Sequence, residues 1–290
     1  MNFYKKKVLI TGSEGFIGKS IKSLLASNEN DYELFTPNKK ELHLFDFTQV
    51  KGYLNTAKPD VVIHCAAVLP SKAGEQSSKE GTIRIDSNIV NAVIDYNKNL
   101  KLIYCSGCSL YKNNGQLLDE SNELFSLNPY LEAKIAGEKL ISESLLNSVI
   151  LRIAAPYGFQ QKIQTVIHIF VKRAITDNNI EIFEEGLRVQ NFTNVKDVSK
   201  AIAEAIKTDK VGTYNICSDR SITMKELAEK IISLSNSKSK IVYKPNIKDK
   251  DDTKVLNLDN SKAKHVLKWK PTVTIEEGII ELINEYRNNL

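Results

Sequence analysis

The side chains of Tyr130 and Lys134, a phenol and an ammonium, stand four residues apart near the start of a predicted helix. Asn128 suits the N-cap of this helix and Pro129 its first position, and apolar and small residues continue to residue 145. Residues at i and i+4 share a helix face, so the two side chains would lie together. A neighbouring cation favours the ionised form of a phenol. Tyr130 is therefore a candidate acid/base that exchanges a proton with a substrate hydroxyl or carbonyl.

An isolated Tyr-x-x-x-Lys pair matches by accident in many proteins, but a glycine-rich turn near the N-terminus adds a dinucleotide site. Residues 7–10 are an apolar run that predicts a buried strand, and residues 11–18 (TGSEGFIG) lead from it into an amphipathic helix. Glycines at such a turn let backbone N–H groups approach a pyrophosphate, which is then held at the helix N-terminus. The spacing is G-x-x-G-x-x-G rather than G-x-G-x-x-G. The predicted cofactor-binding residues of this turn are Gly12, Gly15, Phe16, Ile17 and Gly18.

The segment after the second predicted strand, residues 32–35, indicates which cofactor the site prefers. An NAD-preferring site usually carries an acidic residue where this strand ends, to bond the ribose 2′-hydroxyl. Here residues 36–40 are TPNKK. The missing carboxylate and the two lysines favour a 2′-phosphate and therefore NADP(H), with NAD(H) still possible. Asn38 and Lys39 are the predicted binding residues; the alternative is that the lysines form only a solvated turn.

Two further segments are predicted to contact the cofactor. Asp46, followed by Phe47, is placed to reach the adenine edge. A strand that begins near residue 60 ends in the small residues Ala66 and Ala67, which would let the backbone lie against the cofactor. Tyr130 and Lys134 complete the predicted cofactor-binding set.

Apolar strand-like runs alternate with helical segments, which is typical of an α/β protein with a doubly wound parallel sheet of Rossmann type. The polar segment 71–81 predicts a loop before a helix at 83–97. We expect a dinucleotide-binding domain from residues 1–155 and 189–211, and a smaller α/β substrate-binding lobe from residues 156–188 and 212–290. The active site would lie between them, outside the carboxyl ends of the strands.

The composition of this 290-residue chain is that of an ordinary globular protein, with 42% hydrophobic and 26% charged residues. The net charge is +5, but the lysines are scattered, whereas a nucleic-acid binder concentrates its basic residues in a stripe with aromatic residues. No apolar stretch is long enough to span a membrane, and the N-terminus does not resemble a signal peptide. We therefore expect a cytoplasmic protein with no nucleic-acid or membrane partner.

The chain has four cysteines, and two of them, Cys105 and Cys108, form a C-x-x-C pattern. This pattern occurs in redox and zinc sites. No second close pair completes a metal site, so we predict no metal.

Several motifs, taken in order, resemble the extended short-chain dehydrogenase/reductase family, whose other name is the NAD-dependent epimerase/dehydratase family. They are the glycine turn, the two alanines, the serine-bearing strand end at 106–109, the Tyr130–Lys134 pair, and the segments 151–158 (LRIAAPYG), 188–198 (RVQNFTNVKDV), 212–216 (GTYNI) and 267–271 (LKWKP). The resemblance covers essentially the whole chain and is nearest to GDP-fucose synthase-type epimerase-reductases. It implies an NAD(P)-dependent enzyme, a nucleotide-sugar substrate and a homodimer paired through helices. A stripe of small residues fits such a pairing: Ala133, Ala136 and Gly137.

The family's third catalytic residue, a Ser or Thr that hydrogen-bonds the substrate oxygen, aligns with Gly107. Ser109 would face the same way if the extended strand continued, so it is the predicted catalytic hydroxyl. Ser106 takes this role only if one residue is inserted. Dehydratases of the family carry Asp and Glu at the positions of Cys108 and Ser109, so their absence here argues against 4,6-dehydration. Cys108 would act as an acid/base only if the pKa of its thiol were lowered.

These features predict a 4-keto-sugar reductase that acts on a nucleotide sugar. Hydride transfer would occur at sugar C4, with Tyr130 as acid/base and with Lys134 bonding the nicotinamide ribose, as the resemblance implies. One alternative is a redox-neutral nucleotide-sugar 4-epimerase. Another, of a different class, is a non-catalytic cofactor-sensing protein. The intact Tyr130–Lys134 pair argues against the sensing alternative, and Gly107 favours it.

Overall fold

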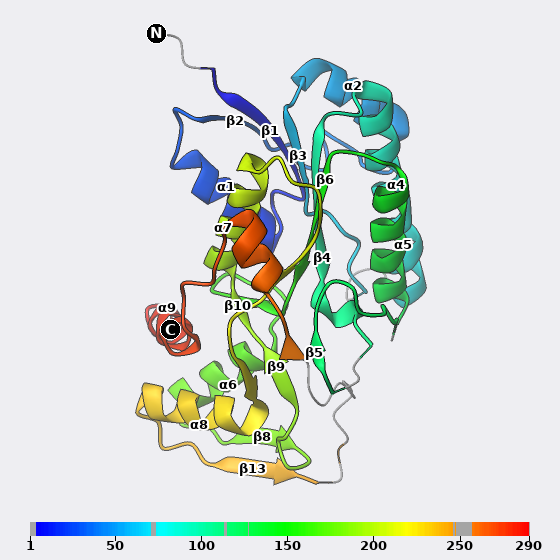
Figure 1. The fold of residues 1–290 in the computed structure, drawn as a ribbon. Coiled ribbons are helices and arrows are strands. Elements are labelled where there is room, and N and C mark those ends of the chain that lie inside the picture. The colour runs from blue at the N-terminus through cyan, green and yellow to red at the C-terminus, as the bar shows by residue number, and fades with distance from the viewer. Residues whose placement is uncertain are drawn as a thin grey trace.

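The structure, a computed structural model, describes residues 4–70, 74–112, 115–126, 128–245, 247 and 257–289. Its centre is a six-stranded sheet in which every neighbouring pair of strands is parallel (Figure 1). In spatial order the strands are β2 (Tyr32–Phe35), β1 (Lys6–Thr11), β3 (Val61–His64), β4 (Lys101–Gly107), β6 (Ser148–Ile153) and β11 (Gly212–Ile216). The chain passes from β1 to β2 on one side and returns to β3 on the other side of β1. The predicted doubly wound parallel sheet is therefore confirmed, and its switch point lies between β1 and β3.

Helices cover both faces of this sheet (Figure 1). Val8 and Ile10 of β1 pack toward one face and Leu9 toward the other, as alternate residues of a strand must. Both faces are thus apolar, which explains why the central strands are continuous apolar runs. One face is covered by α1 (Phe16–Ala26) and α7 (Val195–Lys207), the other by α2 (Phe47–Ala57), α4 (Glu75–Tyr96) and α5 (Pro129–Glu143).

A separate apolar cluster forms a smaller lobe at the carboxyl ends of the strands (Figure 1). Phe170, Leu227 and Ile279, one from each of its three helices, are buried together in it. The helices are α6 (Val166–Ile175), α8 (Met224–Ser235) and α9 (Ile275–Arg287), and the parallel strands β8 (Ile180–Phe183) and β13 (Ile241–Lys244) pack with them.

Short two-stranded pairs join distant parts of the chain. The two pairs that contain β9 and β10 lie between the sheet and the lobe (Figure 1). The pairs are β7 (Pro156–Tyr157) with β10 (Thr193–Asn194), β9 (Val189–Asn191) with β12 (Ser221–Thr223), and β5 (Leu117–Leu118) with β14 (Asn257–Leu258). Two short helical segments, η1 (Cys108–Leu110) and η2 (Ala263–Leu267), complete the described elements.

One part of the predicted domain division differs from the structure. Residues from 212 onward were expected in the smaller lobe, but β11 pairs with β6 in the central sheet. Tyr214 and Ile216 of β11 share a core with Leu267 and Trp269. The physical reason is that all six residues of β6 are buried, so its outer edge needs a hydrogen-bonding partner.

The predicted loop at 71–81 is also different, because α4 already begins at Glu75. Polar residues in its first turns are bonded to the preceding chain rather than to solvent. Ser78 donates to the carbonyl of Val68, and the N–H of Val68 donates to the hydroxyl of Thr82 at 3.1 Å. Their polarity therefore marks an anchoring contact, not a loop. Residues 71–73 lie outside the described part.

Of the helices in the described ranges, none combines the length and the apolar composition that crossing a bilayer requires.

Candidate active site

The predicted helix around Tyr130 and Lys134 is α5, and it begins where the sequence indicates. The side-chain oxygen of Asn128 accepts a hydrogen bond from the N–H of Leu131 at 3.0 Å, and Pro129 occupies the first turn. The N-terminal end of α5 lies against η1, which follows the carboxyl end of β4. Tyr130 is half-buried there, and Lys134 is buried one turn further along. The two side chains interact electrostatically, as the spacing predicts.

Lys134 is held by β4. Its Nζ donates to the hydroxyl of Tyr104 at 3.3 Å and to the carbonyl of Cys105 at 3.1 Å, and the side chain is 5% exposed. Burial alone would lower the pKa of Lys134, but Tyr104 and Asp86 act in the opposite direction and the net shift is upward. Lys134 is therefore an ammonium at neutral pH, as a partner of a phenolate must be.

The structure does not support the geometry on which the choice of Ser109 depended. Residues 108–110 form the 3₁₀ segment η1, so the extended alternation stops at Gly107 and Ser109 is exposed. Ser106 is 7% exposed, and its hydroxyl has no hydrogen-bond partner among the described residues. Ser106 also shares a strand face with Tyr104, which contacts α5. A side chain at Gly107 itself would be accommodated, since a Cβ there meets only the carbonyl of Ile153, at 3.9 Å.

Cys108 is not an accessible acid/base. It is fully buried, and its thiol donates to the carbonyl of Arg152 at 3.1 Å. Burial and the neighbouring Cys217 raise the pKa of the Cys108 thiol well above its usual value, which is the opposite of what acid/base chemistry would require. The two cysteines of the C-x-x-C pattern lie in different apolar clusters, and the sulfur of Cys105 contacts that of Cys65, at 3.4 Å.

The glycine turn brings the ends of β1 and β3 together. Gly12 has a φ of +70°, and a Cβ there would lie 2.7 Å from the backbone nitrogen of Ala66. Only glycine fits this position. At Gly18, a Cβ would lie 2.1 Å from the carbonyl oxygen of Gly12, so the helix passes close over the turn. The N-cap of α1 is Gly15, which supplies no side-chain cap to the first N–H groups of the helix. These N–H groups are suited to an anionic ligand such as a pyrophosphate.

Other predicted cofactor residues surround this turn. Phe16 and Ile17 begin α1 and are half-buried, as are Ala66 and Ala67 after β3. The hydroxyl of Ser13 donates to the carbonyl of Thr36 at 3.3 Å, which ties the turn to the end of β2. The structure therefore gathers the predicted residues from β1, β2 and β3 at one sheet edge.

The turn after β2 stabilises itself. The side-chain oxygen of Asn38 accepts hydrogen bonds from the N–H groups of Lys40 at 2.8 Å and Glu41 at 3.3 Å. The carboxylate of Glu41 in turn accepts from the N–H of Asn38, at 2.8 Å. Lys39 and Lys40 are exposed. The exposed lysines could thus bind a 2′-phosphate. The carboxylate of Glu41 lies in the same turn and would repel it.

Asp46 caps α2 and lines a cavity. Its carboxylate accepts from the backbone and side-chain nitrogens of Gln49 at 3.1 Å and 3.2 Å. The cavity has a volume of about 700 Å³, and Asp46, Phe47 and Arg84 are among its lining residues. A cavity lined by both polar and aromatic side chains, the predicted adenine-binding residues among them, fits that assignment.

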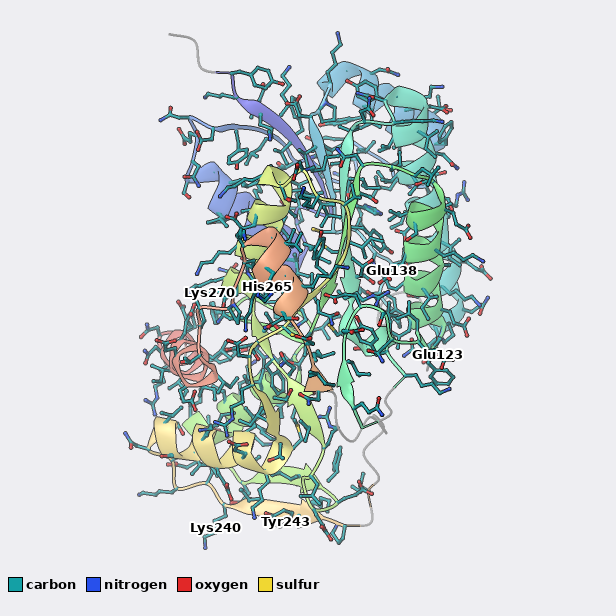
Figure 2. The ribbon with its side chains drawn as sticks, in the orientation of Figure 1. Glu123, Glu138, Lys240, Tyr243, His265 and Lys270 are labelled. Carbon is teal, nitrogen blue, oxygen red and sulfur yellow. The ribbon has the colours of Figure 1, made fainter. Side chains whose placement is uncertain are left out.

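A buried ion pair fixes α5 to the sheet. The guanidinium of Arg152 on β6 donates to the carboxylate of Glu138 with a shortest distance of 2.7 Å, and the two residues are 6% and 4% exposed. Arg152 also donates to the hydroxyl of Tyr111 at 2.9 Å. Burial alone would lower the pKa of Arg152, but Glu138 raises it beyond its usual value. Figure 2 shows Glu138 on the side of α5 that faces the sheet.

Two of the three small residues in the stripe on α5 pack inside the subunit, and Ala136 is half-buried. Ala133 and Gly137 are buried inside the subunit. A Cβ at Gly137 would lie 2.4 Å from the hydroxyl of Tyr104 and 2.5 Å from a carboxylate oxygen of Asp86. These small residues therefore make room for β4 and α4, and the homodimer stays a prediction without their support.

The sequence did not single out Tyr104 and Asp86. Tyr104 lies within an apolar strand, which is a context typical of a core residue. Asp86 follows the apolar Ile85 on a helix that also buries Ile89. A carboxylate among apolar helix positions indicates a buried charge that needs a partner, and this was the signal in the sequence.

Comparisons with known proteins agree with this geometry. The sequence model of the NAD dependent epimerase/dehydratase family matches residues 8–217. UDP-glucuronate 4-epimerase of Thermodesulfobacterium geofontis is 27% identical over 97% of this chain and 96% of its own. The dTDP-4-dehydro-6-deoxyglucose reductase of Escherichia coli is 26% identical over 99% of each chain. UDP-glucose 4-epimerase of Thermotoga maritima, solved with UDP-glucose, has a TM-score of 0.84 at 25% identity and covers 98% of this chain and 99% of its own.

A helix that carries Tyr and Lys beside the dinucleotide turn of a doubly wound sheet defines the class of short-chain dehydrogenases/reductases. The family match runs from β1 through β11, that is, through the whole central sheet. The chain belongs to the NAD dependent epimerase/dehydratase family and is an enzyme. The resemblance seen in the sequence is confirmed.

Proposed function

We propose that the protein is a redox-neutral 4-epimerase of a nucleotide sugar, working with a bound nicotinamide cofactor. The observation that carries the proposal is Tyr130 beside the buried ammonium of Lys134, at the sheet edge that holds the glycine turn. Two relatives of nearly equal length, the UDP-glucuronate 4-epimerase and the Thermotoga UDP-glucose 4-epimerase, support epimerisation over the reduction that the sequence favoured.

In this reaction a hydride leaves one sugar carbon and returns to its other face. A nicotinamide cofactor held at the glycine turn would supply the acceptor and the donor of this hydride. Tyr130 accepts the proton of the sugar hydroxyl at its phenol oxygen during oxidation and returns it during reduction. Lys134 stabilises the phenolate, and the N–H groups at the start of α1 bind the pyrophosphate. No net oxidation occurs, so the same cofactor molecule serves successive turnovers.

Product analysis with UDP-sugars tests the proposal. Purified enzyme should interconvert two 4-epimers of a UDP-hexose or UDP-hexuronate without change in nicotinamide absorbance. Multi-turnover loss of NADPH on 4-keto-6-deoxy sugar nucleotides would instead establish a reductase. Cofactor binding with no turnover of either substrate class would establish the sensing alternative.

The second candidate, the 4-keto-sugar reductase, has its own support. Residues 36–40 lack the acidic residue of an NAD site, which favours NADP(H). A reductase consumes NADPH and exchanges its cofactor in every turnover, so this preference suits a reductase. The Escherichia coli dTDP-4-dehydro-6-deoxyglucose reductase matches along the full chain. Dehydration is disfavoured, since Cys108 is buried and Ser109 is not an acid.

Calorimetric titration should show tighter binding of NADPH than of NADH. One charge-assisted contact between Lys39 and the 2′-phosphate suggests a difference on the order of 1.5–3 kcal/mol. Lys39→Gln should remove most of this difference. Lys240→Gln, at an exposed lysine on the smaller lobe (Figure 2), is the matched control and should leave it unchanged. Equal affinities in the unaltered protein would show that the lysines form only a solvated turn.

The catalytic hydroxyl is tested by two alanine variants. Ser106→Ala should lower turnover about tenfold or more, because a buried hydroxyl without a protein partner is suited to bond the substrate oxygen. Ser109→Ala should stay within about twofold, since an exposed residue in η1 can be shortened with little effect. The reverse order of effects, measured as kcat on the same sugar, would restore Ser109.

A further inference from the structure

A chain of hydrogen bonds runs beneath the candidate site. The hydroxyl of Thr11 contacts Nδ1 of His64 at 2.6 Å, and Nε2 of His64 contacts a carboxylate oxygen of Asp86 at 2.9 Å. The other oxygen of Asp86 accepts from the hydroxyl of Tyr104 at 2.6 Å. Tyr104 then accepts from Nζ of Lys134 at 3.3 Å. All five residues are 5% exposed or less.

The chain joins five elements, β1, β3, α4, β4 and α5, and the sheet register aligns three of its members. Thr11 stands opposite His64, and His64 opposite Tyr104, on adjacent parallel strands. Asp86 reaches in from α4 and Lys134 from α5. The network therefore connects the strand that leads into the glycine turn with the helix that carries Tyr130.

Donor and acceptor roles assign the charges. A phenol has one O–H to donate and lone pairs to accept, and Tyr104 uses both, toward Asp86 and from Lys134. Burial raises the pKa of Tyr104 well above its usual value, so it stays neutral. Asp86 is then the buried anion that balances Lys134, and its other oxygen accepts the Nε2–H of His64.

Gly137 is independent evidence that α5 packs closely against this network. A Cβ at Gly137 would collide with both the hydroxyl of Tyr104 and the carboxylate of Asp86, at 2.4 Å and 2.5 Å. A glycine in the interior of a helix destabilises it relative to alanine. Its presence here allows the approach of Tyr104 and Asp86 to α5.

We propose that Tyr104 and Asp86 are positioning residues of the reaction, which hold the ammonium of Lys134 beneath the phenol of Tyr130. The proposal rests on the proposed function of Tyr130 and Lys134. Without Asp86, the ammonium would be buried with no balancing anion and would lose its proton at lower pH. Without Tyr104, the carbonyl of Cys105 would be its one remaining hydrogen-bond partner among the described residues.

Titratable groups of the described residues act on Lys134 from the elements around it. Tyr130 lies on its own helix, Tyr104 on β4, Asp86 on α4, and the thiol of Cys65 follows β3. Of these, Asp86 is the carboxylate that raises the pKa of Lys134. The charge state of Lys134 therefore depends on Tyr104 and Asp86 together, which is why both are varied below.

Two variants of the full-length enzyme test the proposal. Asp86→Asn removes the charge, and Tyr104→Phe removes the bridging hydroxyl. Each should lower kcat roughly tenfold to a hundredfold at neutral pH, the effect of one lost hydrogen bond to a charged group, with the sugar KM little changed. The alkaline limb of the kcat profile should move to lower pH by about one unit or more in Asp86→Asn.

Tyr111→Phe is the matched control. Tyr111 is 2% exposed, and its hydroxyl bonds Asn215 at 2.6 Å and Arg152 at 2.9 Å. Like Tyr104→Phe, this variant removes one buried tyrosine hydroxyl. Its kcat therefore reports the purely structural effect of losing such a group. Its alkaline limb should stay in place. An alkaline limb that moves as far in Tyr111→Phe as in Asp86→Asn would overturn the proposal.

Unfolding of the cofactor-free protein provides a readout that needs no substrate. A lysine whose folded pKa is raised stabilises the protein below about pH 10.4, its unfolded value, and this stabilisation is lost as pH rises through the folded pKa. The unfolding temperature of Asp86→Asn should therefore fall below that of the unaltered protein at pH 7–9, and the gap should narrow above pH ~10.4. A gap independent of pH would overturn the proposal. Absence of sugar turnover in the unaltered enzyme would contradict the proposed function alone.

Discussion

Replacement of Tyr130 by phenylalanine is expected to lower turnover of the nucleotide sugar at least about a hundredfold, with cofactor affinity near that of the unaltered protein. The variant keeps the aromatic ring at the first turn of α5 and removes only the oxygen that exchanges the proton. Lys134 would keep its partners, since it is bonded to the hydroxyl of Tyr104 and the carbonyl of Cys105. The loss would therefore reflect proton transfer rather than collapse of the site.

Steady-state kinetics measure the turnover, and calorimetric titration measures the cofactor affinity. Tyr243→Phe is the matched control, because Tyr243 is an exposed tyrosine on β13 of the smaller lobe (Figure 2). Its turnover should be unchanged. Near-normal turnover in Tyr130→Phe would exclude Tyr130 as the acid/base, whichever of the two reactions the enzyme catalyses.

Features encoded within one local segment were predictable. The start of α5 needs only the cap at Asn128 and the fixed φ of Pro129, both of which belong to the segment itself. The glycine turn is local in the same sense, since the backbone conformation of Gly12 excludes other side chains. The parallel sheet followed because its buried strands are continuous apolar runs between helices. The sequence therefore predicted the fold class and the place of the Tyr130–Lys134 pair.

Features that depend on contacts between distant segments were not predictable. The choice of Ser109 assumed that the strand continues, and nothing in the sequence shows that β4 ends and η1 begins at residue 108. Asp86 and Tyr104 lie 18 positions apart and gain their meaning only when α4 packs beside β4. The prediction that the sheet ends before residue 212 was wrong for the same reason, because β11 pairs with β6 although α6, β8 and α7 lie between them in the chain.

Arg152→Met should lower the free energy of unfolding by about 3–5 kcal/mol, because it leaves the carboxylate of Glu138 buried without its cation. Glu138 is 4% exposed and receives three hydrogen bonds from Arg152, between 2.7 Å and 3.2 Å. The aliphatic part of Met fills most of the space of the Arg stem. The effect should thus come from the unpaired charge and not from a cavity. Urea unfolding followed by far-UV circular dichroism measures it.

Two further variants separate the unpaired charge from the loss of the pair itself. The double variant Arg152→Met, Glu138→Leu removes both charges and should recover most of the stability, because a buried ion pair contributes little over apolar residues of similar volume. Lys139→Met breaks the exposed pair with Glu143 on the same helix, at 3.8 Å and with side chains 72% and 66% exposed, and should change stability by less than about 1 kcal/mol. If Arg152→Met were no more destabilising than Lys139→Met, the ion pair would not be what fixes α5 to β6. The position of Tyr130 and Lys134 would then depend on the apolar contacts of α5 alone.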